Sequence, residues 1–112
     1  MEIIRKTLTL RELKKKAARL FGNMVKAVVD VDRELLAVDA ELHSDLEALL
    51  LEDGSQHKTL WGINLYPEAP KKDFIEFDSM INVRPSQGNE SRRVEKETLR
   101  KKIRQVVAKR VR

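Results

Sequence analysis

The sequence contains no cysteine and few aromatic residues. Without cysteine, the chain has neither disulfides nor thiolate ligands for a metal ion. Aromatic residues make up only 4% of the chain, so a surface that stacks several nucleic-acid bases on aromatic rings is poorly supplied. Prolines and glycines are also scarce, and no linker or repeat is visible. The 112 residues therefore predict a single domain, residues 1–112, with an ordinary apolar core.

Long apolar runs are missing as well. No stretch approaches the roughly 20 apolar residues that a membrane-spanning helix needs. The first residues, from Met1 to Lys6, lack the apolar core of a signal peptide. We therefore predict a cytoplasmic protein without a membrane partner. No cofactor fingerprint is present, and we predict neither a cofactor nor a metal site.

Charge is abundant, and its two signs are segregated along the chain. The net charge is +5. Residues 1–26 carry eight basic and two acidic residues, whereas residues 27–91 carry five basic and fourteen acidic ones. Residues 92–112 again carry ten basic and two acidic residues. Because like charges add their fields at a distance, such segregation indicates a role in contacts with partners.

Hydrophobic periodicity and capping signals predict eight elements. The first helix follows the capping box Thr9–Glu12 and ends at Gly22, and the second follows Ser44–Glu47 and ends at Gly54. The third begins at about Val94. Strands are expected at residues 2–7, 24–31, 35–43, 60–66 and 74–83. The predicted order is β-α-β-β-α-β-β-α, an α+β two-layer sandwich with a mostly antiparallel sheet of four to five strands.

Alternation along the strands then assigns their two faces. One face is apolar, and we expect about three helices to cover it. The other is expected to be open to water and acidic, as antiparallel sheets often are. The predicted acidic side chains on the open face are Asp30, Asp32, Asp39, Glu41, Glu76 and Asp78.

The first candidate site is catalytic and uses His43, Glu41 and Asp78. If residues 35–43 form one strand, Glu41 and His43 share a face. A carboxylate beside an imidazole orients it and raises its pKa, which suits a general base. With Asp45, the same groups have the chemistry of a divalent-metal site. The alternative is an exposed histidine without a role.

The second candidate is an anion site in the polar loop that follows the last predicted strand. Arginines bind phosphates and carboxylates, and the N-termini of helices favour anions. The alternative is a solvated turn whose proline, glycine and asparagine serve its backbone geometry. The candidate ligand-binding residues are Arg84, Ser86, Gln87, Gly88, Asn89, Ser91, Arg92 and Arg93.

Surface charge offers two further candidates. The acidic face of one copy and the basic helices of another would complement each other in a homodimer. The last helix would instead contact nucleic-acid phosphates, together with Lys14, Lys15 and Arg19 of the first helix. The cations of this last segment are Arg92, Arg93, Lys96, Arg100, Lys101, Lys102, Arg104, Lys109, Arg110 and Arg112. The alternative to both candidates is that the basic helices simply present a solvated charged face without a partner.

Four stretches resemble a known family: Glu41–His43, Leu49–Ser55, Leu60–Asn64 and Ile81–Asn89. The family consists of small prokaryotic proteins classed as a domain of unknown function, and the resemblance covers nearly the whole chain. It implies a prokaryotic, cytoplasmic protein and assigns no chemistry to any residue.

Three hypotheses follow. The leading one is a binding or interaction module, as a homodimer, that acts through its segregated charges. The second is a small hydrolase or ribonuclease-like enzyme that uses His43 and Glu41 with the loop from Arg84 to Arg93. The third is a nucleic-acid-binding module.

Overall fold

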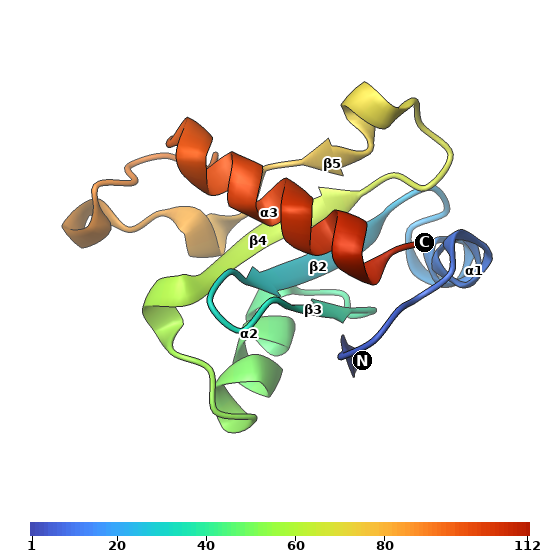
Figure 1. The fold of residues 1–112 in the computed structure, drawn as a ribbon, viewed down its shortest axis with the longest axis horizontal. Coiled ribbons are helices and arrows are strands. Elements are labelled where there is room, and N and C mark those ends of the chain that lie inside the picture. The colour runs from blue at the N-terminus through green and yellow to red at the C-terminus, as the bar shows by residue number, and fades with distance from the viewer.

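Five antiparallel strands form one sheet in the computed structural model, which describes residues 1–112 (Figure 1). The strands are β1 (Glu2–Ile4), β2 (Val25–Asp30), β3 (Leu35–Val38), β4 (Leu60–Leu65) and β5 (Ile75–Glu76). The helices are α1 (Leu10–Leu20), α2 (His43–Glu52) and α3 (Glu97–Arg110). Short 3-10 helices lie at η1 (His57–Thr59), η2 (Lys71–Asp73), η3 (Met80–Asn82) and η4 (Pro85–Gln87). The α+β class and the order of strands and helices are confirmed.

The strand order across the sheet is β1-β3-β2-β4-β5. The pair β2–β4 is the longest and runs in register from Val25 opposite Leu65 to Asp30 opposite Leu60. None of the helices combines the length and the apolarity that crossing a membrane requires.

Helices cover both faces of the sheet, so the prediction that all of them cover one face is wrong. α1 and α3 pack on the face of Ala27, Val29 and Leu36. α2 packs on the opposite face, against Val28 and Ala37, and Figure 1 shows it behind the sheet while α3 crosses in front. The physical reason is that β2 and β3 have apolar residues at neighbouring positions, which makes both of their faces apolar.

The open acidic face is also largely absent. Asp30 is fully buried, and its Oδ1 accepts hydrogen bonds from the Asp32 and Arg33 amides and from the Thr59 hydroxyl. Asp39 lies outside β3 and pairs with Arg19. These two carboxylates therefore stabilise turns and tie segments together.

All five strands are shorter than predicted, and β3 and β5 lose the most residues. β3 ends at Val38, because Asp39 adopts a left-handed conformation with φ of 77°. β5 ends at Glu76. Beyond it, Asn64 Nδ2 of β4 donates to the Asp78 carbonyl at 3.2 Å, and the side chain of Asn82 then bonds to Gly62 of β4. That amide accepts from the Gly62 N–H at 2.8 Å and donates to the Gly62 carbonyl at 2.9 Å. A side chain thus replaces strand pairing, which alternation alone does not reveal.

Helix starts were predicted with mixed success. The capping box of Thr9 and Glu12 is confirmed, with Glu12 N–H donating to Thr9 Oγ1 at 3.1 Å. The box expected at Ser44 is wrong, because α2 already begins at His43 and Leu42 precedes it without a side-chain cap. α3 begins at Glu97, three residues after the expected Val94.

Candidate functional site

The loop that follows η3 is held in place by Asn89. This side chain is 3% exposed and donates to the carbonyls of Asn82, Ser91 and Arg93 at 2.7, 3.1 and 2.7 Å. Its Oδ1 accepts from the Glu95 amide at 2.9 Å. Because all of its hydrogen-bonding groups are engaged within the chain, Asn89 organises the loop.

Arg84 is likewise built into the fold. Its guanidinium donates to the carbonyls of Ile81 and His57, both at 2.9 Å, and to that of Leu60 at 2.5 Å. It also lies 3.4 Å from a Glu47 carboxylate oxygen and 4.6 Å from the centre of the Trp61 ring. Burial lowers the pKa of Arg84, and Glu47 opposes that shift. The predicted anion ligand is therefore a buried cross-link with little capacity for another partner.

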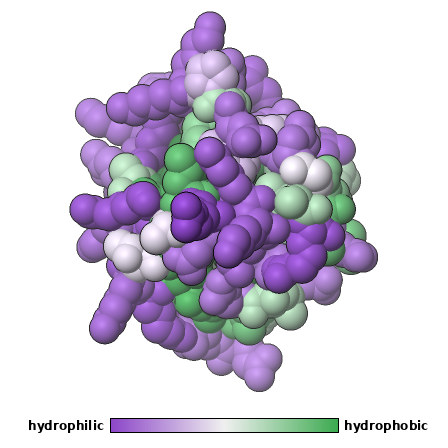
Figure 2. Space-filling view, turned by 90° about the vertical axis from the view of Figure 1, so that its right-hand side faces the viewer, coloured by the Kyte–Doolittle hydropathy of each residue, from purple (hydrophilic) through white to green (hydrophobic).

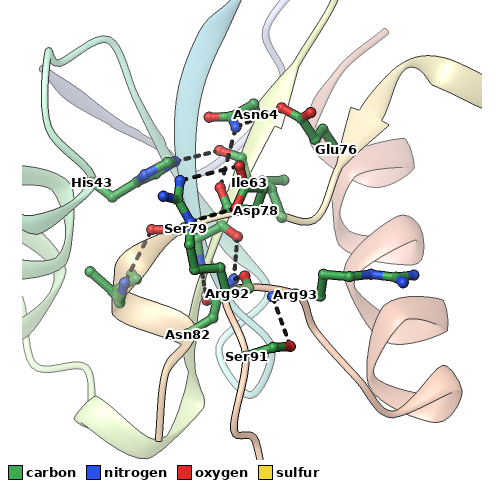
Figure 3. A network of polar contacts seen from close by, with 12 residues as sticks. His43, Ile63, Asn64, Glu76, Asp78, Ser79, Asn82, Ser91, Arg92 and Arg93 are labelled. Carbon is green, nitrogen blue, oxygen red and sulfur yellow. Dashed lines mark hydrogen bonds and ion pairs between the residues drawn. The ribbon is translucent and has the colours of Figure 1, made fainter.

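The remaining loop residues do not converge on one point. Arg92 binds Asp78 through two hydrogen bonds of 2.8 and 3.2 Å. Ser91 Oγ accepts from the Arg93 amide at 3.2 Å, and Figure 3 shows the Arg93 side chain pointing away from Asp78. Ser86 is exposed, and Gly88 provides a left-handed turn with φ of 81°. Only Gln87 and Asn89 of this loop line a groove together with α3.

That groove, which we call the basic groove, lies between η4, α3 and β4. Its volume is about 570 Å³. Its cations are Lys58, Lys96, Lys101 and Lys102, and no carboxylate lines it. The lysines that pair with carboxylates elsewhere are Lys16 and Lys109, so the four lysines of the groove are unpaired.

The local structure explains how the basic groove forms. Thr98, Lys101, Lys102 and Gln105 follow the spacing i, i+3, i+4, i+7, so one stripe of α3 faces the groove. Lys58 comes from η1, whose position is tied to the loop by the Gln87 amide donating to the Lys58 carbonyl at 3.1 Å. The sequence predicted a basic surface on the last helix, but it gave no sign that Lys58 would lie beside it.

A second pocket, which we call the polar cluster, contains three of the predicted residues. His43, Asp78 and Arg92 line it together with Lys26, Asn64 and Glu76, in a volume of about 390 Å³ (Figure 3). Glu41 and Arg84 do not line this pocket, which separates the predicted catalytic set. The strand register could have pointed to the new members, because Lys26 pairs with Asn64 and Asn64 with Glu76 across three strands.

His43 is mostly buried at the start of α2, with 8% exposure. Its Nε2 lies 2.8 Å from the Ile63 carbonyl oxygen. Since a carbonyl only accepts, we assign the ring proton to Nε2, which leaves Nδ1 as the acceptor. Burial lowers the pKa of His43, and the hydrogen bond to Ile63 opposes this shift. The neutral imidazole is therefore favoured.

Hydrogen bonds also engage the carboxylate of Glu76. It accepts from Asn64 Nδ2 and from the Tyr66 hydroxyl, both at 2.9 Å. Burial, followed by the bond to Glu76, raises the pKa of Tyr66. Ser79 also lines the pocket and is almost fully buried. Its hydroxyl oxygen accepts a hydrogen bond from the Ile81 amide at 3.3 Å. The cluster thus supplies a base and charged groups without an evident nucleophile.

A family model described as "Protein of unknown function (DUF5674)" matches residues 2–110. The chain belongs to this family. Searches of curated proteins and of solved structures found no match.

Membership of the family confirms the resemblance seen in the sequence. The description of the family names no activity and no ligand. No group of three or more histidine, aspartate or glutamate side chains is arranged to hold a metal ion. The basic groove offers an anion a set of unpaired cations, while the polar cluster balances its cations with carboxylates.

Proposed function

We propose that the protein is a binding module for nucleic acid and that it contacts phosphates through the basic groove. The observation that carries this proposal is the set of four unpaired lysines, which no carboxylate accompanies in the groove. Lysines that lack internal partners are free to exchange their counterions for phosphates. The proposal assumes the cytoplasmic location that the sequence predicts.

The chemistry favours recognition of the backbone over recognition of bases. Trp61 lies in the groove, but it is only 4% exposed and the Arg84 guanidinium covers its ring. Base stacking is therefore not available there. Lysines act as point charges on flexible stems, which suits phosphate contact with little sequence preference.

The experiment is a fluorescence anisotropy titration with labelled single-stranded RNA and labelled duplex DNA, at low and at near-physiological salt. We expect submicromolar binding at low salt and a steep loss as salt rises. Competition with inorganic tripolyphosphate distinguishes a nucleic acid from a small polyphosphate, since both would supply phosphates to the groove. If tripolyphosphate displaces the oligonucleotide at equal phosphate concentration, the ligand is a small polyphosphate.

Absence of binding even at low salt would contradict the proposal. The basic surface would then be assigned to contacts between copies of the chain. The homodimer expected from the sequence has weaker support than before, because Asp30 is buried and Asp39 pairs with Arg19. Light scattering at micromolar concentration distinguishes a dimer from a monomer and completes the test.

A hydrolase is the second candidate, on the observation that His43, Asp78 and Arg92 share one pocket. In that case His43 Nδ1 would act as the general base. The same labelled RNA tests it: cleavage by the protein, abolished by His43→Gln, would support an enzyme. Intact RNA after prolonged incubation would exclude ribonuclease activity on that substrate.

A further inference from the structure

A third groove, the apolar groove, lies between the second half of α3, the segment from Pro67 to Phe77 and the start of α1. Its volume of about 750 Å³ lies within the usual range of small-molecule sites. Figure 2 faces the side that carries α1 and the C-terminus and shows a band of hydrophobic surface between hydrophilic side chains. The apolar lining includes Phe74, Ile75, Phe77, Val107, Ala108 and Val111.

The floor of the apolar groove continues into the main core. Phe74, Ile75, Phe77 and Val111 are half-buried and pack against the core between the sheet, α1 and α3. A ligand that covers them would therefore remove existing apolar surface from water, which is a favourable change.

The walls of the groove are fixed by pairing between the two chain ends. The Leu8 amide donates to the Arg110 carbonyl at 2.7 Å, and the Arg112 amide donates to the Leu8 carbonyl at 2.9 Å. These bonds join the segment before α1 to the end of α3. A site with fixed walls loses less entropy when a ligand binds.

The rim of the apolar groove carries one sign of charge. Lys71, Lys72, Arg104 and Arg112 line it, and no lining residue is acidic. Arg104 pairs with Glu97 at 3.1 Å and stacks over Phe77 at 5.3 Å, whereas Lys71 and Lys72 form no ion pair with a carboxylate. An occupant must therefore combine an apolar body with a negative group.

We propose that the apolar groove binds a single-chain amphiphilic anion, an alkyl carboxylate. The alkyl chain lies on the aromatic and aliphatic floor, and the carboxylate meets the cations of the rim. A nucleic-acid backbone has the charge but would leave the floor uncovered. This site is separate from the basic groove, with which it shares no lining residue.

Isothermal titration calorimetry of the whole chain tests the proposal with four probes: decanoate, octanoate, decanol and decyltrimethylammonium. Decanoate should bind, and octanoate should bind roughly ten-fold more weakly because two methylenes fewer are buried. Decanol should bind more weakly than decanoate, and the cationic probe should not bind. Equal affinity for the anionic and cationic probes would overturn the assignment of the rim.

Two variants locate the site. Ala108→Phe fills the groove from an exposed position of α3 and should weaken decanoate by about ten-fold or more, since the space is then occupied. Its matched control is Ala48→Phe, at an exposed position of α2 outside the groove. The double variant Lys71→Glu/Lys72→Glu should weaken decanoate by roughly ten-fold while sparing decanol.

Wild-type affinity in Ala108→Phe, with the fold intact by circular dichroism, would overturn the proposal. So would binding of anionic phosphatidylglycerol vesicles without any binding of monomeric decanoate, because the surface would then recognise a membrane. Lys101→Glu should leave decanoate binding unchanged, which separates this site from the basic groove.

Discussion

A single arginine joins three segments at the residue scale. Arg84 connects the carbonyls of His57, Leu60 and Ile81 from a position that is 5% exposed. Sequence reasoning gave this residue to an anion, because a sequence shows donors and does not show which carbonyls will surround them. The same limit applies to Asn89, whose amide closes the loop rather than facing a ligand.

The first prediction concerns the stability that Arg84 provides. Arg84→Leu should lower the free energy of unfolding by about 3 kcal/mol, since buried carbonyls and Glu47 lose their partner. Arg93→Leu is the matched control on the exposed part of the loop, and it should change the free energy by less than about 0.5 kcal/mol. Urea unfolding measures both. Equal effects would mean that Arg84 is not the cross-link described.

The second prediction concerns His43 and pH. Because burial lowers the pKa of His43 below its ordinary value of 6.5, the unfolded chain binds more protons at this residue than the folded chain. The contribution to stability is therefore complete above about pH 6.5 and is lost as pH falls toward the folded-state pKa. Nearby Lys26 adds to the lowering, and Asp78 opposes it.

The measurement compares urea unfolding at about pH 7.5 and about pH 5.5 in the wild type, in His43→Gln and in Ser44→Ala. His43→Gln should lose less stability on acidification than the wild type. Ser44→Ala, an exposed neighbour without a side-chain hydrogen bond in the helix cap, should keep the wild-type dependence. The same pH dependence in all three proteins would contradict this role for His43.

At the scale of elements, the starts of α1 and α2 make a matched comparison. Both have a serine or threonine followed three residues later by glutamate. Thr9 precedes its helix and accepts from the Glu12 amide, whereas Ser44 already lies inside α2. The difference arises because His43 is drawn into α2, where its ring contacts the carbonyl of Ile63 in β4.

The third prediction follows from that difference. Thr9→Ala should lower the free energy of unfolding by about 1 kcal/mol, the usual effect of losing a helix cap. Ser44→Ala should change it by less than about 0.5 kcal/mol. Thermal or urea unfolding of the two variants tests the comparison, and a larger loss for Ser44→Ala would contradict the observed start of α2.

Elements with strong local signals were predictable from the sequence. The order of strands and helices, the Thr9 cap and the presence of an apolar sheet face under helices are of this kind. Long-range contacts were not predictable. The side chain of Asn82 takes the place of strand pairing at Gly62, where a Cβ would lie 2.5 Å from that of Ser79. No local pattern in residues 74–83 predicts that Asn82 and Ser79 will lie against Gly62.

The candidate sites follow the same rule. The lysines of α3 could be named from the sequence, because helical spacing is a local pattern. Their approach to Lys58 and Gln87 could not be predicted, because it depends on long-range contacts. The catalytic set was split, since the turn at Asp39 removes Glu41 from the strand on which it was expected to accompany His43.

At the scale of the whole molecule, the distribution of charge matters more than its sum. The acidic middle of the chain is used largely within the fold: Asp30 stabilises a turn, and Asp53 pairs with Arg5 and Arg33. The lysines of the basic groove have no such partners. Segregation along the sequence therefore becomes, after folding, an unneutralised positive groove with a long-range field.

The fourth prediction, and the most direct test, is the slope of log binding constant against log salt for duplex DNA. Lys101→Gln/Lys102→Gln should make the slope shallower by about two units, because two phosphate contacts are lost. The matched control, Lys14→Gln/Lys15→Gln, removes the same charge from α1. No residue of α1 lines the basic groove, so the part of the prediction that paired the two basic helices is not kept, and this control should leave the slope near the wild-type value. Equal changes in both variants would mean that binding follows net charge alone and would contradict the basic groove as the site.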